Sequence, residues 1–389
     1  MTSKLSRTVL ALGFVSFLTD FSSEMIYPLL PVFLTTVLAA GPRALGAIEG
    51  VAESTASLVK LASGLWSDRV KRRKPLVLAG YALAGAVRPL VGLATVWPTV
   101  LAIRFFDRVG KGLRSSPRDA LIADVTPPAI LGHAYGVQRS LDHAGAVVGP
   151  LVAAVLLATG VSLRNVFLLA AIPAAVVVLV LTFGVAEPER KMRARPDSES
   201  AGRLGRPFRV FLFAVLVFTL GNSSDAFLLL RLSSAGMTAA SVAALWSVFH
   251  VVKMLASYAG GALSDRLGRR SLMVLGWCVY AGVYASFGLV TTPATLAATL
   301  LVYGLYFGLT EPVERAWVAE MAPAHLKGTA FGYYHGTVGL AALPASLLFG
   351  ALWYAFGPTA AFFTGAGLSL AAAMVLFSSD LSRKSFSES

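Results

Sequence analysis

A short charged segment occurs twice in the chain, and both times it joins two long apolar runs. The first copy is residues 64–74, GLWSDRVKRRK, and the second is residues 261–270, GALSDRLGRR. A membrane span needs about 20 mainly apolar residues, and the runs on either side of each copy are that long. The duplication therefore predicts a chain of two similar halves, each built from membrane-spanning helices.

The low share of charged residues supports this prediction. Of 389 residues, 56% are hydrophobic and only 14% are charged, whereas soluble domains carry about 25% charged residues. The predicted fold class is an all-α integral membrane protein with twelve transmembrane helices and no separate soluble domain. The expected spans are 8–34, 44–66, 75–95, 98–124, 134–158, 164–185, 208–232, 238–263, 271–291, 293–318, 328–353 and 357–379.

The basic residues gather in alternate loops. The formal net charge is +13, and most of it lies in the loop after Asp68 and in the middle of the chain between Glu187 and Arg209. The other loops carry few cations. This positive-inside bias places both termini and the mid-chain loop in the cytoplasm. It also explains the net charge without nucleic-acid binding, which we do not expect.

The two halves match beyond the charged segment. Residues 22–24, SSE, correspond to 223–225, SSD, and residues 123–127, ADVTP, correspond to 319–323, AEMAP. Gly132 and Gly136 correspond to Gly328 and Gly332. We therefore expect an N-terminal six-helix bundle over 1–186, a cytoplasmic linker over 187–207 and a C-terminal six-helix bundle over 208–389.

The small residue, the Asp-Arg pair and the basic cluster between the second and third spans of each half resemble the signature loop of the major facilitator superfamily of secondary transporters. The resemblance implies two parallel six-helix repeats in a cell inner membrane, with the substrate site between them near mid-membrane. It also implies a monomer that works in the lipid bilayer. The gating roles that it implies fall on Gly64, Asp68, Arg69, Arg73, Asp265, Arg266 and Arg270. The carboxylate of such a loop would accept helix-terminus N–H groups and pair with an arginine.

The fifth span carries small residues at helical spacing. Gly136, Gly145, Gly149 and Pro150 resemble the fifth-span motif of the drug/proton antiporter branch of that superfamily. Residues 153 and 154 are both alanine, where that motif usually has paired glycines. The resemblance implies export. Ordinary close packing of helices explains the same glycines.

Charges inside a bilayer are costly unless they face a cavity or a partner, which makes them the candidate functional residues. Asp20 and Glu24 lie four residues apart in the first span and so share one helix face. Either could couple transport to protons or contact substrate, and either could instead neutralise a fixed cation.

The fourth span is unusually rich in charge. Six charged residues form a stripe about 120° wide on one face of the expected helix: Arg104, Asp107, Arg108, Lys111, Arg114 and Arg118. Such a stripe must line a polar cavity or meet acids of other spans, for which Asp20, Glu24 and Asp142 are the candidates. A cationic cavity favours an anionic substrate or a metal chelate. For the end from Arg114 onward, a gating network is the favoured interpretation.

In the remaining spans, Asp225 is the best candidate because it corresponds to Glu24 in the repeat. Asp142 lies three residues after Arg139, and the spacing of Glu311 and Arg315 predicts a local ion pair. His250 and His335 could bind metal or act near neutral pH, although membrane histidines are more often packing residues.

We therefore predict a secondary transporter that exports a small organic molecule in exchange for protons. The alternative is an exporter of a divalent metal ion, a metal chelate or an organic anion, with the span-one acids, Asp225 and the histidines as ligands. An enzyme is not expected, because the usual metalloprotease, phosphate-loop and serine-hydrolase motifs do not occur. No cofactor and no resident metal are expected.

Overall fold

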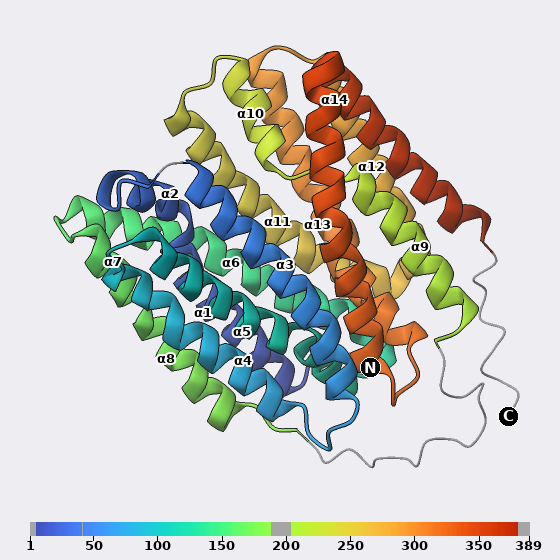
Figure 1. Ribbon diagram of the computed structural model, residues 1–389. Helices are drawn as coiled ribbons and strands as arrows, with labels where there is room; N and C mark the ends of the chain where they lie inside the picture. The colour runs from blue at the N-terminus through green and yellow to red at the C-terminus, as the bar shows by residue number, and fades with distance from the viewer. Residues whose placement is uncertain (1–4, 41, 188–203, 380–389) are drawn as a thin grey trace, which may run out of the picture.

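The computed structural model describes residues 5–40, 42–187 and 204–379, and this part of the chain contains helices and connections but no strand. The predicted linker 187–207 lies largely outside the described residues. Figure 1 shows α4, α7 and α8 on one side of the molecule and α9, α12 and α14 on the other. The longer helices are α1 (Arg7–Glu24), α3 (Pro42–Ser67), α4 (Lys74–Val87), α5 (Trp97–Asp124), α6 (Leu131–Ala158), α7 (Leu163–Leu169), α8 (Ala171–Leu179), α9 (Arg206–Gly221), α10 (Ala226–Ser234), α11 (Ala239–Leu267), α12 (Arg269–Leu289), α13 (Pro293–Met321) and α14 (Lys327–Ser378).

Short helical turns complete the described elements. The first predicted span continues through η1 (Tyr27–Leu29), α2 (Leu30–Val32) and η2 (Phe33–Val37). The third continues through η3 (Arg88–Leu93) and the sixth through η5 (Val180–Gly184), and η4 (Pro128–Ile130) precedes α6. Proline stands in the first turn of η1, α2 and η3. There its missing N–H costs no intrahelical bond, so these turns start where the preceding helix ends.

Eight stretches of the described residues are long and apolar enough to cross a membrane. One of them is α14, which continues through Gly357 at a φ of 84°, so the eleventh and twelfth predicted spans fall within one kinked helix. The spans predicted over 44–66, 98–124 and 238–263 coincide with α3, α5 and α11, which are not among the eight. The all-helical class is confirmed, and the count of twelve crossings stays a prediction.

Two long helix pairs join the early and the late part of the chain. Helix α3 packs along α14, and α6 packs along α11. Both pairs make backbone contacts at glycine. A Cβ on Gly64 would lie 2.4 Å from the carbonyl oxygen of Gly328. A Cβ on Gly261 would lie 2.4 Å from the carbonyl oxygen of Gly132. The glycines that correspond in the sequence repeat therefore make equivalent contacts, which only a missing side chain allows.

The loop carboxylates reinforce these two contacts. Asp68 accepts hydrogen bonds from the backbone N–H groups of Gly328 and Thr329, at 2.9 and 2.6 Å. Asp265 accepts from Gly132 and His133, at 2.9 and 2.7 Å. Each carboxylate thus caps the first turn of a helix from the other part of the chain, where the helix dipole favours negative charge. We call the end of the molecule that carries these two loops the basic end.

One arginine in each loop holds the carboxylate in place. Arg73 lies 2.8 Å from Asp68 and 3.2 Å from Asp124. In the second copy the equivalent residue is Arg269, which lies 2.7 Å from Asp265 and 3.5 Å from Glu320. The sequence match between Asp124 and Glu320 is therefore a match of ion-pair partners.

The prediction that Arg270 matches Arg73 is wrong. Arg270 donates to the carbonyl oxygen of Phe377 and lies over its ring. The cause is Gly268, whose φ of 87° lets a single residue connect α11 to α12. The second loop is therefore tighter, and the arginine one position earlier reaches the carboxylate. Arg69 and Arg266, which were also predicted to gate, are exposed.

A methyl group on Gly64 should separate the two parts of the chain at the basic end. It would meet backbone atoms of Gly328 and Gly332 that cannot rotate away, so α14 must move. We expect longer distances between spin labels placed at Arg69 and Ala324 in Gly64→Ala, measured by double electron–electron resonance after Cys278→Ser. The matched control is Gly50→Ala on the same helix, where a Cβ meets nothing within 4 Å. Equal distance distributions in the two variants would contradict the contact.

Neighbouring arginines should differ sharply in their effect on stability. Arg269→Gln leaves the carboxylate of Asp265 without its cation, which in buried pairs costs about 3–5 kcal/mol. Arg270→Gln removes only a contact to Phe377. We expect the thermal unfolding temperature in detergent to fall clearly in the first variant and little in the second. A larger fall in Arg270→Gln than in Arg269→Gln would indicate instead that Arg270 is the partner of Asp265.

Candidate functional site

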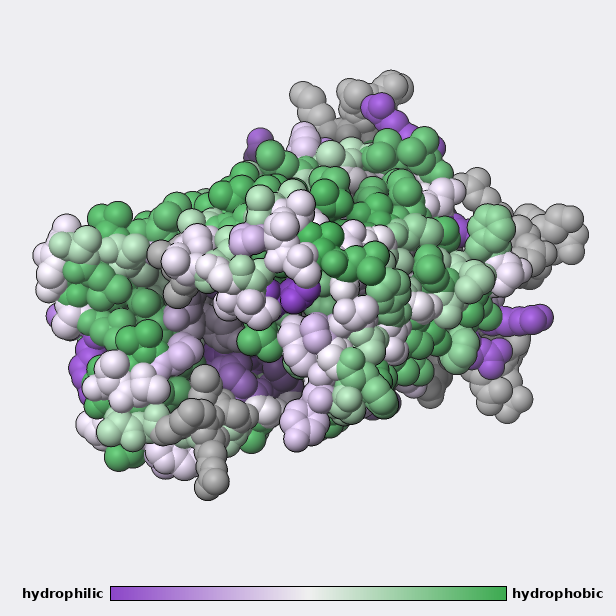
Figure 2. Space-filling model, turned by 90° about the horizontal axis from the view of Figure 1, so that it is seen from above, coloured by the Kyte–Doolittle hydropathy of each residue, from purple (hydrophilic) through white to green (hydrophobic). Residues whose placement is uncertain are grey.

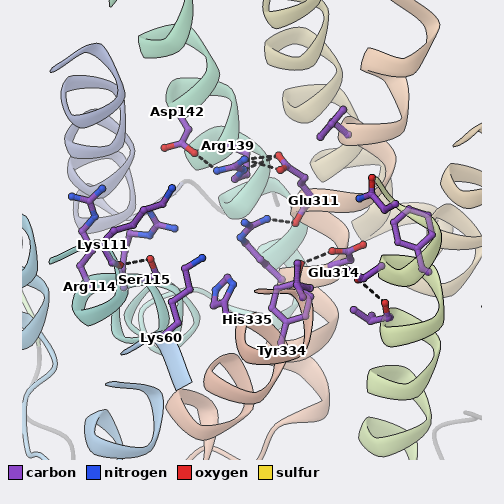
Figure 3. A pocket seen from close by; sticks show the side chains of 18 of the residues that line it. Lys60, Lys111, Arg114, Ser115, Arg139, Asp142, Glu311, Glu314, Tyr334 and His335 are labelled. Carbon is purple, nitrogen blue, oxygen red and sulfur yellow. Dashed lines mark hydrogen bonds and ion pairs between the residues drawn. The ribbon is translucent and has the colours of Figure 1, made fainter. Parts of the chain in front are cut away.

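A cavity of about 380 Å³ lies between the two parts of the chain. Its walls come from α1, α3, α5 and α6 on one side and from α9, α13 and α14 on the other. Figure 3 shows Lys60, Lys111 and Arg114 on one side of it and Glu311, Glu314 and Tyr334 on the other. Figure 2 shows that the molecule is hollowed on the face seen from above, with hydrophilic residues inside the hollow and hydrophobic residues around it. The arrangement is that of a polar site inside an apolar shell.

Helix α5 supplies most of the positive charge. Arg104, Arg108, Arg114 and Arg118 are each less than a tenth exposed, so the stripe does not face the surface of the molecule. Arg118 lies 2.8 Å from Asp119, and Arg114 lies over the ring of Tyr81 at 4.1 Å. Lys111 and Arg114 line the cavity, as does Lys60 on α3.

The acids that meet the outer part of the stripe are not the predicted ones. Arg104 lies 2.9 Å from Glu49, and Arg108 lies 3.5 Å from Glu53. Asp107 lies 2.8 Å from Arg88. In the part of the chain that the structure describes, neither Asp20, Glu24 nor Asp142 forms an ion pair with the stripe. Of the two expectations for the stripe, the one that it lines a polar cavity therefore fits Lys111, Arg114 and Arg118.

Glu49, Glu53 and Lys60 lie on one face of α3, because they are four and seven residues apart. That spacing was visible in the sequence and could have identified them.

Glu311 joins α13 to α6 across the cavity. Its carboxylate lies 2.7 Å from Arg139 and 3.1 Å from His143, and Arg139 also contacts Asp142. The predicted pair of Arg139 and Asp142 is confirmed. The predicted local pair of Glu311 and Arg315 is wrong, because Arg315 donates instead to the backbone carbonyl of Glu311 at 2.7 Å.

A second group of charges joins the two parts of the chain nearer the basic end. Asp119 on α5 lies 2.8 Å from His335 on α14 and 3.5 Å from Arg315 on α13. Tyr135 donates to the backbone carbonyl of Asp119 at 2.6 Å. His335 is therefore placed by a buried carboxylate. Together with the loop contacts, this group closes the cavity on the side of the basic end.

Helix α1 brings one of its two predicted carboxylates to the cavity. Asp20 lines it, whereas Glu24, one turn further along, does not. Neither side chain forms an ion pair among the described residues. Gly145 and Gly149 let α6 approach α1 closely, since a Cβ on Gly145 would lie 2.2 Å from the carbonyl oxygen of Phe17. Two of the motif glycines thus position α1, while Gly136 contacts α11 instead and Pro150 lies inside α6.

Two of the second-half candidates, Asp225 and His250, lie outside the lining of this cavity. Asp225 accepts a hydrogen bond from Tyr303 at 3.0 Å. The ring of His250 lies 6.0 Å from that of His143, which belongs to α6. Within the described residues no group of three or more His, Cys, Asp or Glu side chains is arranged to hold a metal ion.

Comparisons with known proteins agree with this geometry. The family model described as Major Facilitator Superfamily matches residues 12–252 and 210–388. An uncharacterized MFS-type transporter of Methanocaldococcus jannaschii is 31% identical over 380 residues, 96% of this chain and 95% of that protein. The multidrug resistance protein MdtG of Citrobacter koseri is 26% identical over 382 residues, 94% of this chain and 93% of its own.

Solved structures share the fold. The human organic anion transporter MFSD10 superposes with a TM-score of 0.79 at 18% identity, covering 95% of this chain and 99% of its own. The Escherichia coli fucose:proton symporter FucP superposes with a TM-score of 0.78 at 14% identity, covering 95% and 97%. The chain is a multi-pass membrane protein that belongs to the Major Facilitator Superfamily, whose members are transporters rather than enzymes.

Proposed function

We propose that this transporter exports a small organic molecule from the cell in exchange for protons. In this proposal the bundles 1–186 and 208–389 rock about the central cavity, joined by the linker 187–207. The basic end and both termini face the cytoplasm, in keeping with the loop charges. The protein works as a monomer in the cell inner membrane. The closed basic end and the hollow opposite it are then an outward-facing state.

The observation that carries proton coupling is the position of Asp20. Its side chain lines the cavity and forms no ion pair among the described residues, while α1 is fixed against α6 at Gly145. A proton arriving at this carboxyl group removes a buried charge without leaving a cation unpaired. Glu311 and Asp142 cannot do this as simply, because both already contact Arg139. Asp20 is therefore the proposed proton carrier, and Glu24 is the second candidate.

The direction of transport follows from two likenesses. The fifth span resembles that of drug/proton antiporters, and the chain is similar over most of its length to a multidrug resistance protein. A divalent metal ion as cargo is less well supported, because the described residues offer no cluster of three ligands. Two of the four acids that line the cavity, Asp142 and Glu311, are moreover bound to Arg139.

Asp20→Asn should abolish the effect of a proton gradient on transport. In proteoliposomes with an acidic interior, the wild-type protein should take up members of a panel of aromatic organic anions and cations at least about tenfold faster than without the gradient. Asn keeps the size of the side chain but cannot release a proton, so the variant should show equal rates under both conditions.

Two further measurements show whether a loss of the gradient effect is specific to proton coupling at Asp20. Exchange of labelled for unlabelled substrate, which needs no net proton movement, should persist in Asp20→Asn. Glu24→Gln removes a carboxylate that does not line the cavity and should keep most of the gradient effect. Full gradient-driven uptake by Asp20→Asn would refute the role of Asp20, and its loss in Glu24→Gln alone would move that role to Glu24.

A further inference from the structure

We infer that the cavity selects an organic anion with a flat aromatic body, whose carboxylate or phosphate binds to Lys60 and Lys111. This inference rests on the proposed function in one respect, namely that the central cavity is the substrate site. It adds the chemical class of the substrate and the residues that recognise it.

Lys60 and Lys111 are cations of the cavity without a direct partner among the described residues. The acids that attract them, Glu53 for both and Asp20 for Lys111, act from beyond ion-pair distance. Both line the cavity, and within the described residues neither ammonium group donates a hydrogen bond or forms an ion pair. An ammonium group without a paired counter-charge is unfavourable at membrane depth. Two such groups on one wall repel each other as well. An anion that binds between them removes both costs.

Close packing of α3 against α5 holds the two lysines together. Ser116 donates to the backbone carbonyl of Lys60 at 2.8 Å, and Ser63 donates to that of Gly112, the neighbour of Lys111, at 2.8 Å. A Cβ on Gly112 would lie 2.5 Å from the side chain of Val59. The backbones of the two helices therefore meet at the level of Lys60 and Lys111, and the site is built before any ligand enters.

The remaining charges on this wall leave the positive potential in place. Arg114 also lines the cavity and lies over the ring of Tyr81, at 4.1 Å. Asp142 is held by Arg139. Asp20 is the one acid of α1 that lines the cavity. With Asp20 ionised, as it must be when substrate binds in exchange for a proton, the wall still presents three cations, Lys60, Lys111 and Arg114, against one unpaired carboxylate.

The opposite wall is aromatic. Phe218, Tyr306 and Phe307 line the cavity from α9 and α13, and their rings form a continuous series. The ring centroids of Phe218 and Tyr306 are 5.6 Å apart, and those of Tyr306 and Phe307 are 4.9 Å apart. An aromatic ligand gains both apolar contact and ring stacking there.

Both acids on that wall already have a partner within the protein. Glu311 is bound to Arg139, and Glu314 accepts a hydrogen bond from Tyr334. The cavity volume of about 380 Å³ is within the range of about 300–1,000 Å³ found for small-molecule sites. A ligand with an aromatic ring at one end and an anionic group at the other matches both walls.

Equilibrium binding to the purified full-length protein tests this inference with ligands of one shape and different charge. The probes are 2-naphthoate, 2-naphthyl phosphate, 2-naphthamide and 2-naphthylmethylammonium, with affinities measured by isothermal titration calorimetry. We expect at least one of the two anions to bind about 10- to 100-fold more tightly than the neutral amide, as a charge-assisted hydrogen bond provides. The cation should bind more weakly than the amide. Comparison of the carboxylate with the phosphate identifies the anionic group.

Variants assign the anion preference to the two lysines. Lys60→Gln and Lys111→Gln should each lower the affinity for the anion about tenfold or more, while the affinity for the amide stays within about twofold. Lys60→Arg keeps the charge and should keep most of the preference. The matched control is Lys71→Gln, the same change at an exposed loop position, which should change neither affinity.

Three results would overturn the inference. They are equal binding of anion and amide by the wild-type protein, binding of none of the four probes, and an anion preference that survives both lysine substitutions. Because the measurement needs no gradient, it separates the two proposals. Anion binding without proton-driven flux would refute only the proposed exchange, and proton-driven flux of uncharged molecules alone would refute only the anion site.

Discussion

Two aspartates, each capping a helix from the other part of the chain, determine the form of this transporter. Asp68 and Asp265 accept two backbone N–H groups each, and each is fixed by an arginine of its own loop. Glycine contacts between α3 and α14 and between α6 and α11 lie directly beside these caps. Two equivalent contacts, α3 with α14 and α6 with α11, thereby close the basic end. Because the helices meet there, they enclose a cavity between their other portions.

Inside that cavity the charges fall into two groups. Arg139 with Glu311, and Asp119 with His335, are pairs that cross between the two parts of the chain. They hold the present conformation and must separate if the two parts move apart at the basic end. The second group, Lys60, Lys111 and Asp20, has no ion-pair partner among the described residues. Charges without partners are available to a substrate or a proton, so we assign recognition and coupling to them.

Much of the fold follows from the sequence because the membrane limits the choices. Apolar runs of span length must form helices, and a duplicated motif must occupy equivalent positions. The sequence match of Gly132 and Gly136 with Gly328 and Gly332 identified residues that lie at the contacts of α6 with α11 and of α14 with α3. The expectation that Arg270 corresponds to Arg73 failed because the alignment ignores backbone geometry, and Gly268 shortens the second loop.

The ion pairs could not be predicted in the same way. Helical spacing shows which charges share a face, and it correctly paired Arg139 with Asp142. It does not show which helix faces which, so Glu311 was paired with Arg315 on its own helix instead of with Arg139 on α6. The spacing of Glu49 and Glu53 shows that they share a face of α3, but their partners on α5 become evident only when α3 lies beside it. Contacts between spans depend on helix packing, which one sequence does not specify.

The central claim is that unpaired charges lie in a water-filled cavity that is open on the side away from the basic end. Accessibility of position 111 tests this most directly. A single cysteine replacing Lys111, in protein lacking Cys278 and reconstituted in one orientation, can be exposed to a membrane-impermeant thiol reagent from either side. The account predicts much faster labelling from the side opposite the basic end. Labelling only from the basic end, or from neither side, would contradict it.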